Sequence, residues 1–377
     1  MKTKTLLLFA TIAAITLVFT SCKKHDFPPL CGGTDDSTVT TIKVFATGLN
    51  NPRGLKFGPD GNLYVAEAGT GGTHFYTGCQ QVIPPVGPYL GSDSGSRISK
   101  IDWNGTRTTL VDYLPSSTFQ AAEGGGISGV ADVAFIGPNM YAIFAGAGCS
   151  HAVPDVPNGV IKIKPDRSWT MIANLSEFQM ANPVKNPNPG DFEPDGTWWN
   201  MINVAGNLYA VEPNHGELDK ITPSGTVSRI IDISAAEGHI VPTALVAHDG
   251  LFYIGNLDVI PFTTGSSTVF QVTQDGQIKV YATGFTTVLG LAFDNHDRLY
   301  VLETSVAGFA PGTGDIVRLD QFGNKEVIAS GLNFPTGMTF GPDGKLYVSG
   351  TGIGAPGAGQ ILQISFKCEE VQGDMKQ

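Results

Sequence analysis

The phrase FGPDGNLYV at residues 57–65 returns almost unchanged as FGPDGKLYV at residues 340–348. In both copies an apolar stretch leads into a Gly-Pro-Asp-Gly turn and a second apolar stretch follows, which is the pattern of a tight β-hairpin. Aligning the chain on the tyrosine of the phrase gives six copies, at Tyr64, Tyr141, Tyr209, Tyr253, Tyr300 and Tyr347. A hairpin that recurs six times indicates a repeat architecture.

Five of the six copies are followed, across a loop of variable length, by a second hairpin, so each unit holds four antiparallel strands. Four-stranded units at this spacing predict an all-β, six-bladed β-propeller. The last unit supplies too few strands, whereas residues 41–49 (TIKVFATGL) resemble the final strands of other units. We therefore predict one propeller domain over residues 39–368, in which the N-terminal strand completes the C-terminal blade, followed by a tail at 369–377.

The N-terminus has the features of an export signal. Two lysines precede an apolar run at residues 6–19, which ends in Thr-Ser before Cys22 and resembles the lipobox of bacterial lipoproteins. We expect residues 1–21 to be a lipoprotein signal peptide and Cys22 to be lipidated, with 22–38 as a flexible tether. An ordinary secretory signal is the alternative. Both place the protein outside the cytoplasm, and the lipid anchor would hold it on a membrane, on the periplasmic or cell-surface side.

Four cysteines remain once Cys22 is set aside, and four cysteines allow three pairings. Cys31 and Cys368 flank the repeats, while Cys79 and Cys149 occupy comparable places in two successive units. We predict these two disulfides, with free buried thiols as the alternative.

Composition excludes several function classes. The chain has 48 Gly, 24 Pro, 15% charged residues and a net charge of −11, so it lacks the basic face that nucleic acid requires. It contains no G-x-S-x-G, P-loop, H-E-x-x-H or C-x-x-C motif. The glycine-rich stretch at 124–129 is interpreted as a flexible linker, and a monomer is expected.

The repeated phrase and the hairpin after it resemble NHL-type and gluconolactonase-type six-bladed propellers. Over residues 41–365 the chain is similar to the ScyD/ScyE family, on the start NPRGLKFGPDGNLYVAEAG, the glycine-rich insert after it and the hairpin GSDSGSRISKID. That family's namesakes are encoded with the biosynthesis of an indolic pigment. The resemblance implies the fold and export, and it carries over no catalytic residues.

The loops between second and third strands are long and should emerge together on one face, which we expect to bind a ligand. Oxygen-bearing side chains recur three residues after the aligned tyrosines, and two more fall on predicted innermost strands. Such groups suit Ca²⁺ or another divalent metal, and gluconolactonase-like propellers hold a metal with Glu, Asn and Asp at the channel. The alternative is that they bond neighbouring backbone amides or Arg53. The predicted metal ligands are Glu67, Asp132, Asn200, Glu212, Asn256 and Glu303.

A second group of side chains on the same face is predicted to contact the ligand. Trp198 is a stacking candidate, with packing between blades as its alternative. Arg53 is expected to face the channel and form a structural ion pair with an acid such as Glu67, with binding of an anion as the alternative. The histidines are interpreted as metal or acid-base groups, or simply as solvated side chains. The predicted ligand-binding residues are Arg53, His74, His151, His215, His239 and Trp198.

Two functions remain open at this point. The first is a lipid-anchored propeller that binds a small molecule, glycan or protein through its loop-rich face. The alternative is a metal-dependent enzyme outside the cytoplasm, either a lactonase-like or esterase-like hydrolase or an oxidoreductase of aromatic metabolites, with its site at the channel mouth.

Overall fold

The computed structural model describes residues 37–369 except 121–124 and 321. The predicted signal peptide, Cys22, Cys31, the tether up to residue 36 and the tail from 370 onward lie outside this part of the chain. The predictions that concern them therefore stay predictions. Among the described residues, no helix is both long enough and apolar enough to cross a bilayer.

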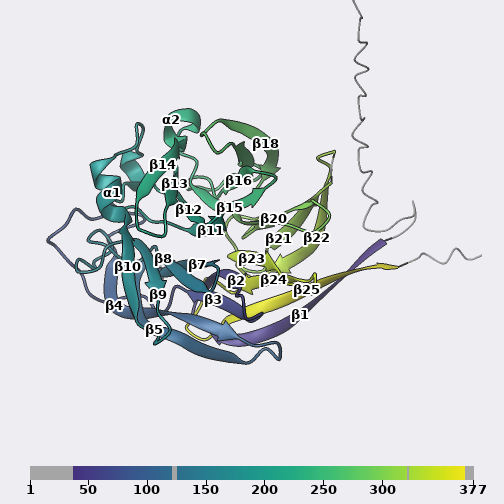
Figure 1. Cartoon of the computed structure of the whole chain (residues 1–377). Coiled ribbons are helices and arrows are strands. Elements are labelled where there is room, and N and C mark those ends of the chain that lie inside the picture. The colour runs from purple at the N-terminus through teal and green to yellow at the C-terminus, as the bar shows by residue number, and fades with distance from the viewer. Residues whose placement is uncertain (1–36, 121–124, 321, 370–377) are drawn as a thin grey trace, which may run out of the picture.

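The chain forms six small antiparallel sheets arranged as the blades of a propeller, as the sequence predicts (Figure 1). Numbered along the chain, the blades have as innermost strands β2 (Pro52–Phe57), β7 (Val130–Ile136), β11 (Asn200–Val204), β15 (Pro242–His248), β19 (Val288–Phe293) and β23 (Gly337–Phe340). The second strands, which carry the repeated tyrosine, are β3 (Leu63–Glu67), β8 (Asn139–Phe144), β12 (Asn207–Glu212), β16 (Leu251–Asn256), β20 (Leu299–Glu303) and β24 (Leu346–Gly350).

The outer half of each blade is a second hairpin. The third strands are β4 (Leu90–Ile101), β9 (Gly159–Ile163), β13 (Glu217–Ile221), β17 (Ser267–Val272), β21 (Gly314–Leu319) and β25 (Gly359–Glu369). The outermost strands are β5 (Arg107–Phe119), β10 (Trp169–Asn174), β14 (Val227–Asp232), β18 (Ile278–Phe285), β22 (Lys325–Leu332) and, in the sixth blade, β1 (Ser37–Leu49).

Strand β1 closes the ring, which confirms the prediction from the sequence. It pairs antiparallel with β25 from Ser37 opposite Glu369 to Leu49 opposite Gly359, so the two ends of the described chain lie side by side (Figure 1). The sheet that results contains β23, β24 and β25 from the C-terminus and β1 from the N-terminus. This blade cannot be completed without both ends of the chain.

The connections differ from the sequence interpretation at one point. The glycine-rich stretch interpreted as a flexible linker contains β6 (Gly126–Ser128), which pairs with β5 and gives the first blade a fifth strand. Two short α-helices, α1 (Leu175–Ala181) and α2 (Ile233–Glu237), and the 3₁₀ turn η2 (Pro189–Asp191) lie in the links between blades.

One of the two predicted disulfides is present in the structure. Cys79 and Cys149 are joined, with a sequence separation of 70, and they tie the long loop after β3 to the loop after β8. The predicted Cys31–Cys368 pair stays a prediction, because Cys31 lies outside the described residues.

The repeated tyrosine joins neighbouring blades. In four blades its ring meets, edge to face, a phenylalanine near the end of the next blade's innermost strand, with ring centroids 4.9–5.1 Å apart. These pairs are Tyr64 with Phe135, Tyr253 with Phe293, Tyr300 with Phe340 and, across the closure, Tyr347 with Phe57. In three of the same blades the tyrosine hydroxyl donates to an aspartate of its own hairpin turn, at 2.9–3.1 Å. The apolar ring is thereby buried between blades while its polar tip keeps a partner.

We predict that Tyr347→Ala destabilises the propeller far more than a surface substitution of the same kind. The side chain is fully buried at the contact between the sixth and first blades. Truncating a buried aromatic ring to alanine costs about 3–5 kcal/mol in free energy of unfolding. Tyr113→Ala is the matched control, because Tyr113 is 78% exposed and should change this free energy by less than about 0.5 kcal/mol. Denaturant unfolding measures both, and equal effects would contradict the role assigned to Tyr347.

Candidate functional site

A pocket of about 500 Å³ opens on the face that carries the loops between second and third strands. All six blades or their connections contribute to it, and the lining is mainly apolar. Its aromatic members are Tyr89, Phe119, Trp199, Phe262 and Phe309, and its aliphatic members are Val86, Val241, Leu257, Ile260, Leu289 and Ile353. We call this cavity the loop-face pocket.

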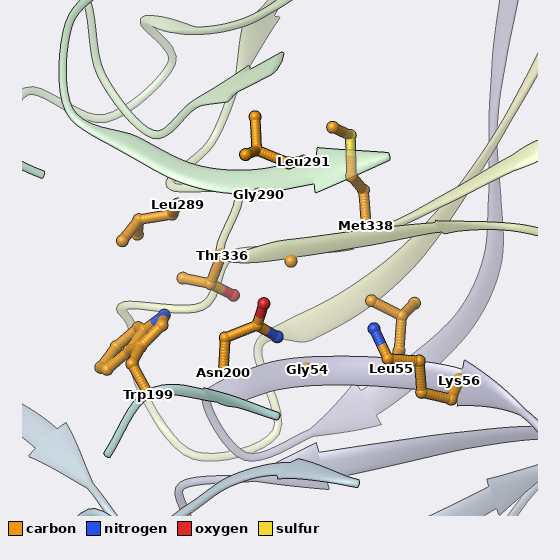
Figure 2. A pocket seen from close by; sticks show the side chains of 11 residues that line it. Gly54, Leu55, Lys56, Trp199, Asn200, Leu289, Gly290, Leu291, Thr336 and Met338 are labelled. Atoms are coloured by element: carbon orange, nitrogen blue, oxygen red, sulfur yellow. The ribbon is translucent and has the colours of Figure 1, made fainter. Parts of the chain in front are cut away.

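The channel below the pocket is nearly closed. Figure 2 shows the lining of a small space between β2, β11, β19 and β23, to which Trp199 and Thr336, just before β11 and β23, also contribute. They leave a space of about 10 Å³, hardly enough for one water. Trp199, Leu289 and Thr336 line both spaces and so form the floor of the loop-face pocket. A ligand in the pocket therefore rests on this floor instead of passing down the axis.

Arg53 lines the pocket and is only 3% exposed. Its guanidinium donates to the carbonyl oxygens of Pro52 (3.2 Å), Ile127 (2.6 Å) and Gly352, and it lies 5.2 Å from the ring centre of Trp199. Burial lowers the pKa of Arg53 to about 9, which still leaves it charged at neutral pH. Among the described residues, it is held by carbonyl dipoles and an aromatic face and forms no ion pair with an acid.

The predicted pair between Arg53 and Glu67 is wrong. Glu67 instead forms an ion pair with Arg97 at 2.8 Å, lies 3.9 Å from Arg107 and accepts the hydroxyl of Ser99. These partners lie on β4 and β5, the outer strands of the same blade. The Glu67 carboxylate therefore binds residues of its own blade and does not contact Arg53.

A buried polar cluster stands at the wall of the loop-face pocket. The hydroxyl of Tyr89 donates to Oε1 of Glu193 at 2.6 Å, and Nε2 of His151 lies 3.3 Å from Oε2. His215 is held by the backbone carbonyl of Glu193, 2.8 Å from its Nε2, and Asn214 accepts from the Glu193 amide. Burial alone would raise the pKa of Glu193, but His151 and Tyr89 outweigh it and lower the pKa, so the carboxylate is ionised. Burial lowers the pKa of His215.

Sequence reasoning did not single out Glu193 or Tyr89. Glu193 stands in the Pro-rich and Gly-rich link between the second and third blades, and Tyr89 ends the long insert of the first blade. The one available signal was their position in segments that the topology places on the loop face. Of the predicted histidines, the structure brings His151 and His215 to this cluster, whereas His74 is exposed and His239 lines a smaller neighbouring cavity of about 290 Å³.

Four of the predicted metal ligands have a shared structural role. Each stands at the end of a second strand and bonds the backbone two or three residues before an innermost strand begins. Glu67 accepts from the Asn50 amide (2.6 Å), Glu212 from Thr197 (2.7 Å) and Glu303 from Thr286 (2.5 Å), while Asn256 donates to the Ile240 carbonyl (2.8 Å). These side chains fix the links that enter the first, third, fourth and fifth blades.

The other two predicted ligands connect innermost strands. Asp132 accepts from the side chain of Asn200 and from the amides of Met201 (3.0 Å) and Val133 (2.8 Å). Asn200 in turn accepts from the Leu245 amide at 2.7 Å, so the chain of bonds crosses the second, third and fourth blades. Burial raises the pKa of Asp132. Gly54 allows the close approach, because a Cβ there would lie 1.9 Å from the carboxylate.

The six predicted ligands are therefore spread over the propeller and engaged with backbone groups, and they do not fit a shared metal ion. Within residues 37–369, apart from the gaps, no group of three or more His, Cys, Asp or Glu is placed to hold a metal. Trp198, predicted to stack on a ligand, is fully buried between blades and donates to Asp219 at 3.1 Å. Its neighbour Trp199 is the one that lines the pocket.

The fold is that of a six-bladed β-propeller, and solved structures of that class are similar to it. They include a gluconolactonase from Xanthomonas campestris (TM-score 0.55, 10% identity, covering 87% of this chain and 90% of that one). A PQQ-bound aldose sugar dehydrogenase from Streptomyces coelicolor gives a TM-score of 0.53 at 12% identity, with 90% and 100% covered. A protein of unknown function from Bacteroides thetaiotaomicron VPI-5482 gives 0.57 at 12% identity, with 88% and 77% covered.

At these identities the likeness concerns the fold alone. No family model matches the chain, and no curated protein matches its sequence. The resemblance to the ScyD/ScyE family therefore remains an expectation, and function has to be argued from the pocket.

We predict that Glu303 makes the propeller less stable as pH rises. Burial, with Asp315 opposite it in the sheet, raises the pKa of Glu303 from 4.5 to about 7. The folded state therefore binds this proton more tightly than the unfolded chain, so the stabilisation is complete below pH 4.5 and is lost as pH rises through about 7.

The measurement is the unfolding free energy of wild type and Glu303→Gln from pH 4.5 to 7. The wild type should lose stability relative to the variant across this window. Glu237→Gln replaces an exposed carboxyl and should follow the wild type. A difference between wild type and Glu303→Gln that is constant with pH would contradict the assignment.

Proposed function

We propose that this protein binds a small, largely apolar molecule in the loop-face pocket. The observation that carries the proposal is the pocket itself, at about 500 Å³ with five aromatic and six aliphatic side chains and a lining surface that is mainly apolar. Sites for small molecules typically measure roughly 300–1,000 Å³ and combine apolar walls with a few placed polar groups. Arg53, Glu193 and Asn214 are such groups here.

The lining favours a small molecule over the other two ligand classes expected from the sequence. A protein partner needs a broad surface, whereas this cavity is a funnel with a closed floor. A glycan would bring many hydroxyl groups, and walls formed by Val241, Leu257 and Leu289 offer them no hydrogen-bond partners.

The proposal includes the export expected from the N-terminal sequence. With Cys22 lipidated, a tether of about 15 residues would have a root-mean-square span of roughly 20–25 Å and would keep the propeller near the membrane. The pocket would then sample molecules near a bilayer, where apolar compounds concentrate.

A second candidate function is catalysis in the same pocket. The contact of Tyr89 and His151 with the Glu193 carboxylate supports it, because such an arrangement can accept and return a proton. Similarity in fold to a gluconolactonase and a sugar dehydrogenase fits this candidate without selecting a reaction. Catalysis would be supported if the protein hydrolyses a lactone or an aryl ester and Glu193→Gln abolishes this activity while the variant still binds molecules in the pocket.

We predict saturable binding of one molecule of N-phenyl-1-naphthylamine, a neutral fluorophore that brightens in apolar surroundings. Ile353→Trp should weaken this binding at least tenfold, because the half-buried Ile353 lines the pocket and an indole there would fill part of it. Fluorescence titration measures the affinity.

Val280→Trp is the control for this titration. Val280 is 53% exposed on the outermost strand of the fourth blade, away from the pocket, so the same substitution should leave affinity unchanged. Failure of the wild type to bind, or equal weakening by both variants, would argue against the loop-face pocket as the binding site.

A further inference from the structure

We propose that the ligand is an amphipathic anion, an aromatic or aliphatic body with one oxyanion group, and that Arg53 is the counter-ion for that group. The inference rests on the proposed binding function of the loop-face pocket and adds the chemical class of its ligand. It depends on how the guanidinium of Arg53 is buried and on which groups surround it.

Arg53 is a buried cation without a carboxylate partner. The residue is only 3% exposed, and no ion pair among the described residues includes it. The three carbonyl oxygens that it contacts are neutral dipoles and occupy three of its five N–H donors. Buried charges are normally paired, because leaving water is costly for an isolated ion. An anionic ligand would supply the missing charge.

Arg53 lies where a ligand in the loop-face pocket could contact it. The guanidinium lies over the Trp199 ring, and Trp199 forms part of the pocket floor, so the charge stands at the bottom of an apolar funnel. Carboxylate, sulfonate and phosphate oxygens are the groups for which the guanidinium fork is best suited. A ligand whose apolar body contacts Phe309 and Leu289 would place its oxyanion at Arg53.

Glu193 is the other charged residue in the lining, and its charge opposes an anion. One of its oxygens accepts from Tyr89, and the other lies 3.3 Å from Nε2 of His151. The chain as a whole carries a net charge of −11, so general attraction for anions cannot explain binding of one. Preference for an anionic ligand would have to come from Arg53 itself.

The experiment compares two fluorophores with the same ring skeleton. One is 8-anilinonaphthalene-1-sulfonate, an anion, and the other is the neutral N-phenyl-1-naphthylamine. We expect the wild type to bind the sulfonate about tenfold to a hundredfold more tightly, as for a hydrogen bond to a charged group in a desolvated site. Arg53→Met should remove this preference, so that the variant binds the two probes with similar affinity.

Two further variants make the assignment specific. Arg53→Lys keeps a positive charge and should retain part of the preference for the sulfonate. Lys56→Met removes a cation from the same strand that does not line the loop-face pocket, and the preference should persist. Circular dichroism establishes that each variant is folded, since Arg53 also joins the Ile127 and Gly352 backbones.

The outcomes separate this inference from the proposed function. Equal affinity of the wild type for the two probes would overturn the anion assignment while leaving pocket binding intact. Absence of binding for both would instead overturn the proposed function. If folded Arg53→Met still prefers the sulfonate, another cation must bind the sulfonate group, and the role of Arg53 would be overturned. Should Arg53→Met not fold, the wild-type ratio and Arg53→Lys still decide the question.

Discussion

The contact between a tyrosine on one blade and a phenylalanine on the next is the interaction on which this structure depends. A single blade has two apolar faces and cannot bury either alone, so each needs a neighbour. The repeated phrase provides for this twice, because its Phe packs on the preceding blade and its Tyr packs on the following one. The same few residues also form the hairpin turn that accepts the tyrosine hydroxyl. Local and long-range structure are thus specified together.

The oxygen-bearing side chains at the ends of the second strands serve this scaffold. Glu67, Glu212, Asn256 and Glu303 attach the incoming links of the first, third, fourth and fifth blades. The interior below is closed by side chains from four innermost strands (Figure 2). Polar groups that recur with the blades are therefore structural. The residues that make the pocket distinctive, Arg53 and Glu193, each occur in one blade or link only.

This division explains how much the sequence could predict. The fold followed from repetition, since six aligned tyrosines and an orphan strand at residues 41–49 permit few arrangements other than a closed ring. The site did not follow, because its residues lie on links whose path is set by contacts distant in sequence. Trp198 and Trp199 illustrate this limit of sequence-based prediction. Either ring could face the pocket from its place just before β11, and the structure buries Trp198 while Trp199 lines the pocket. Likewise, nothing in the sequence near Arg53 showed that Arg97 and Arg107 would take Glu67.

Closure of the ring by β1 and β25 also affects the order in which the molecule can form. The first residues of the propeller pair with β25, so the sixth blade cannot be assembled until β25 has been synthesised. Until then the incomplete sheet presents the unpaired edges of β24 and β1, which are open to pairing with other chains. The ring can therefore close only after β25 has been synthesised, and the chain is exposed to such pairing until then.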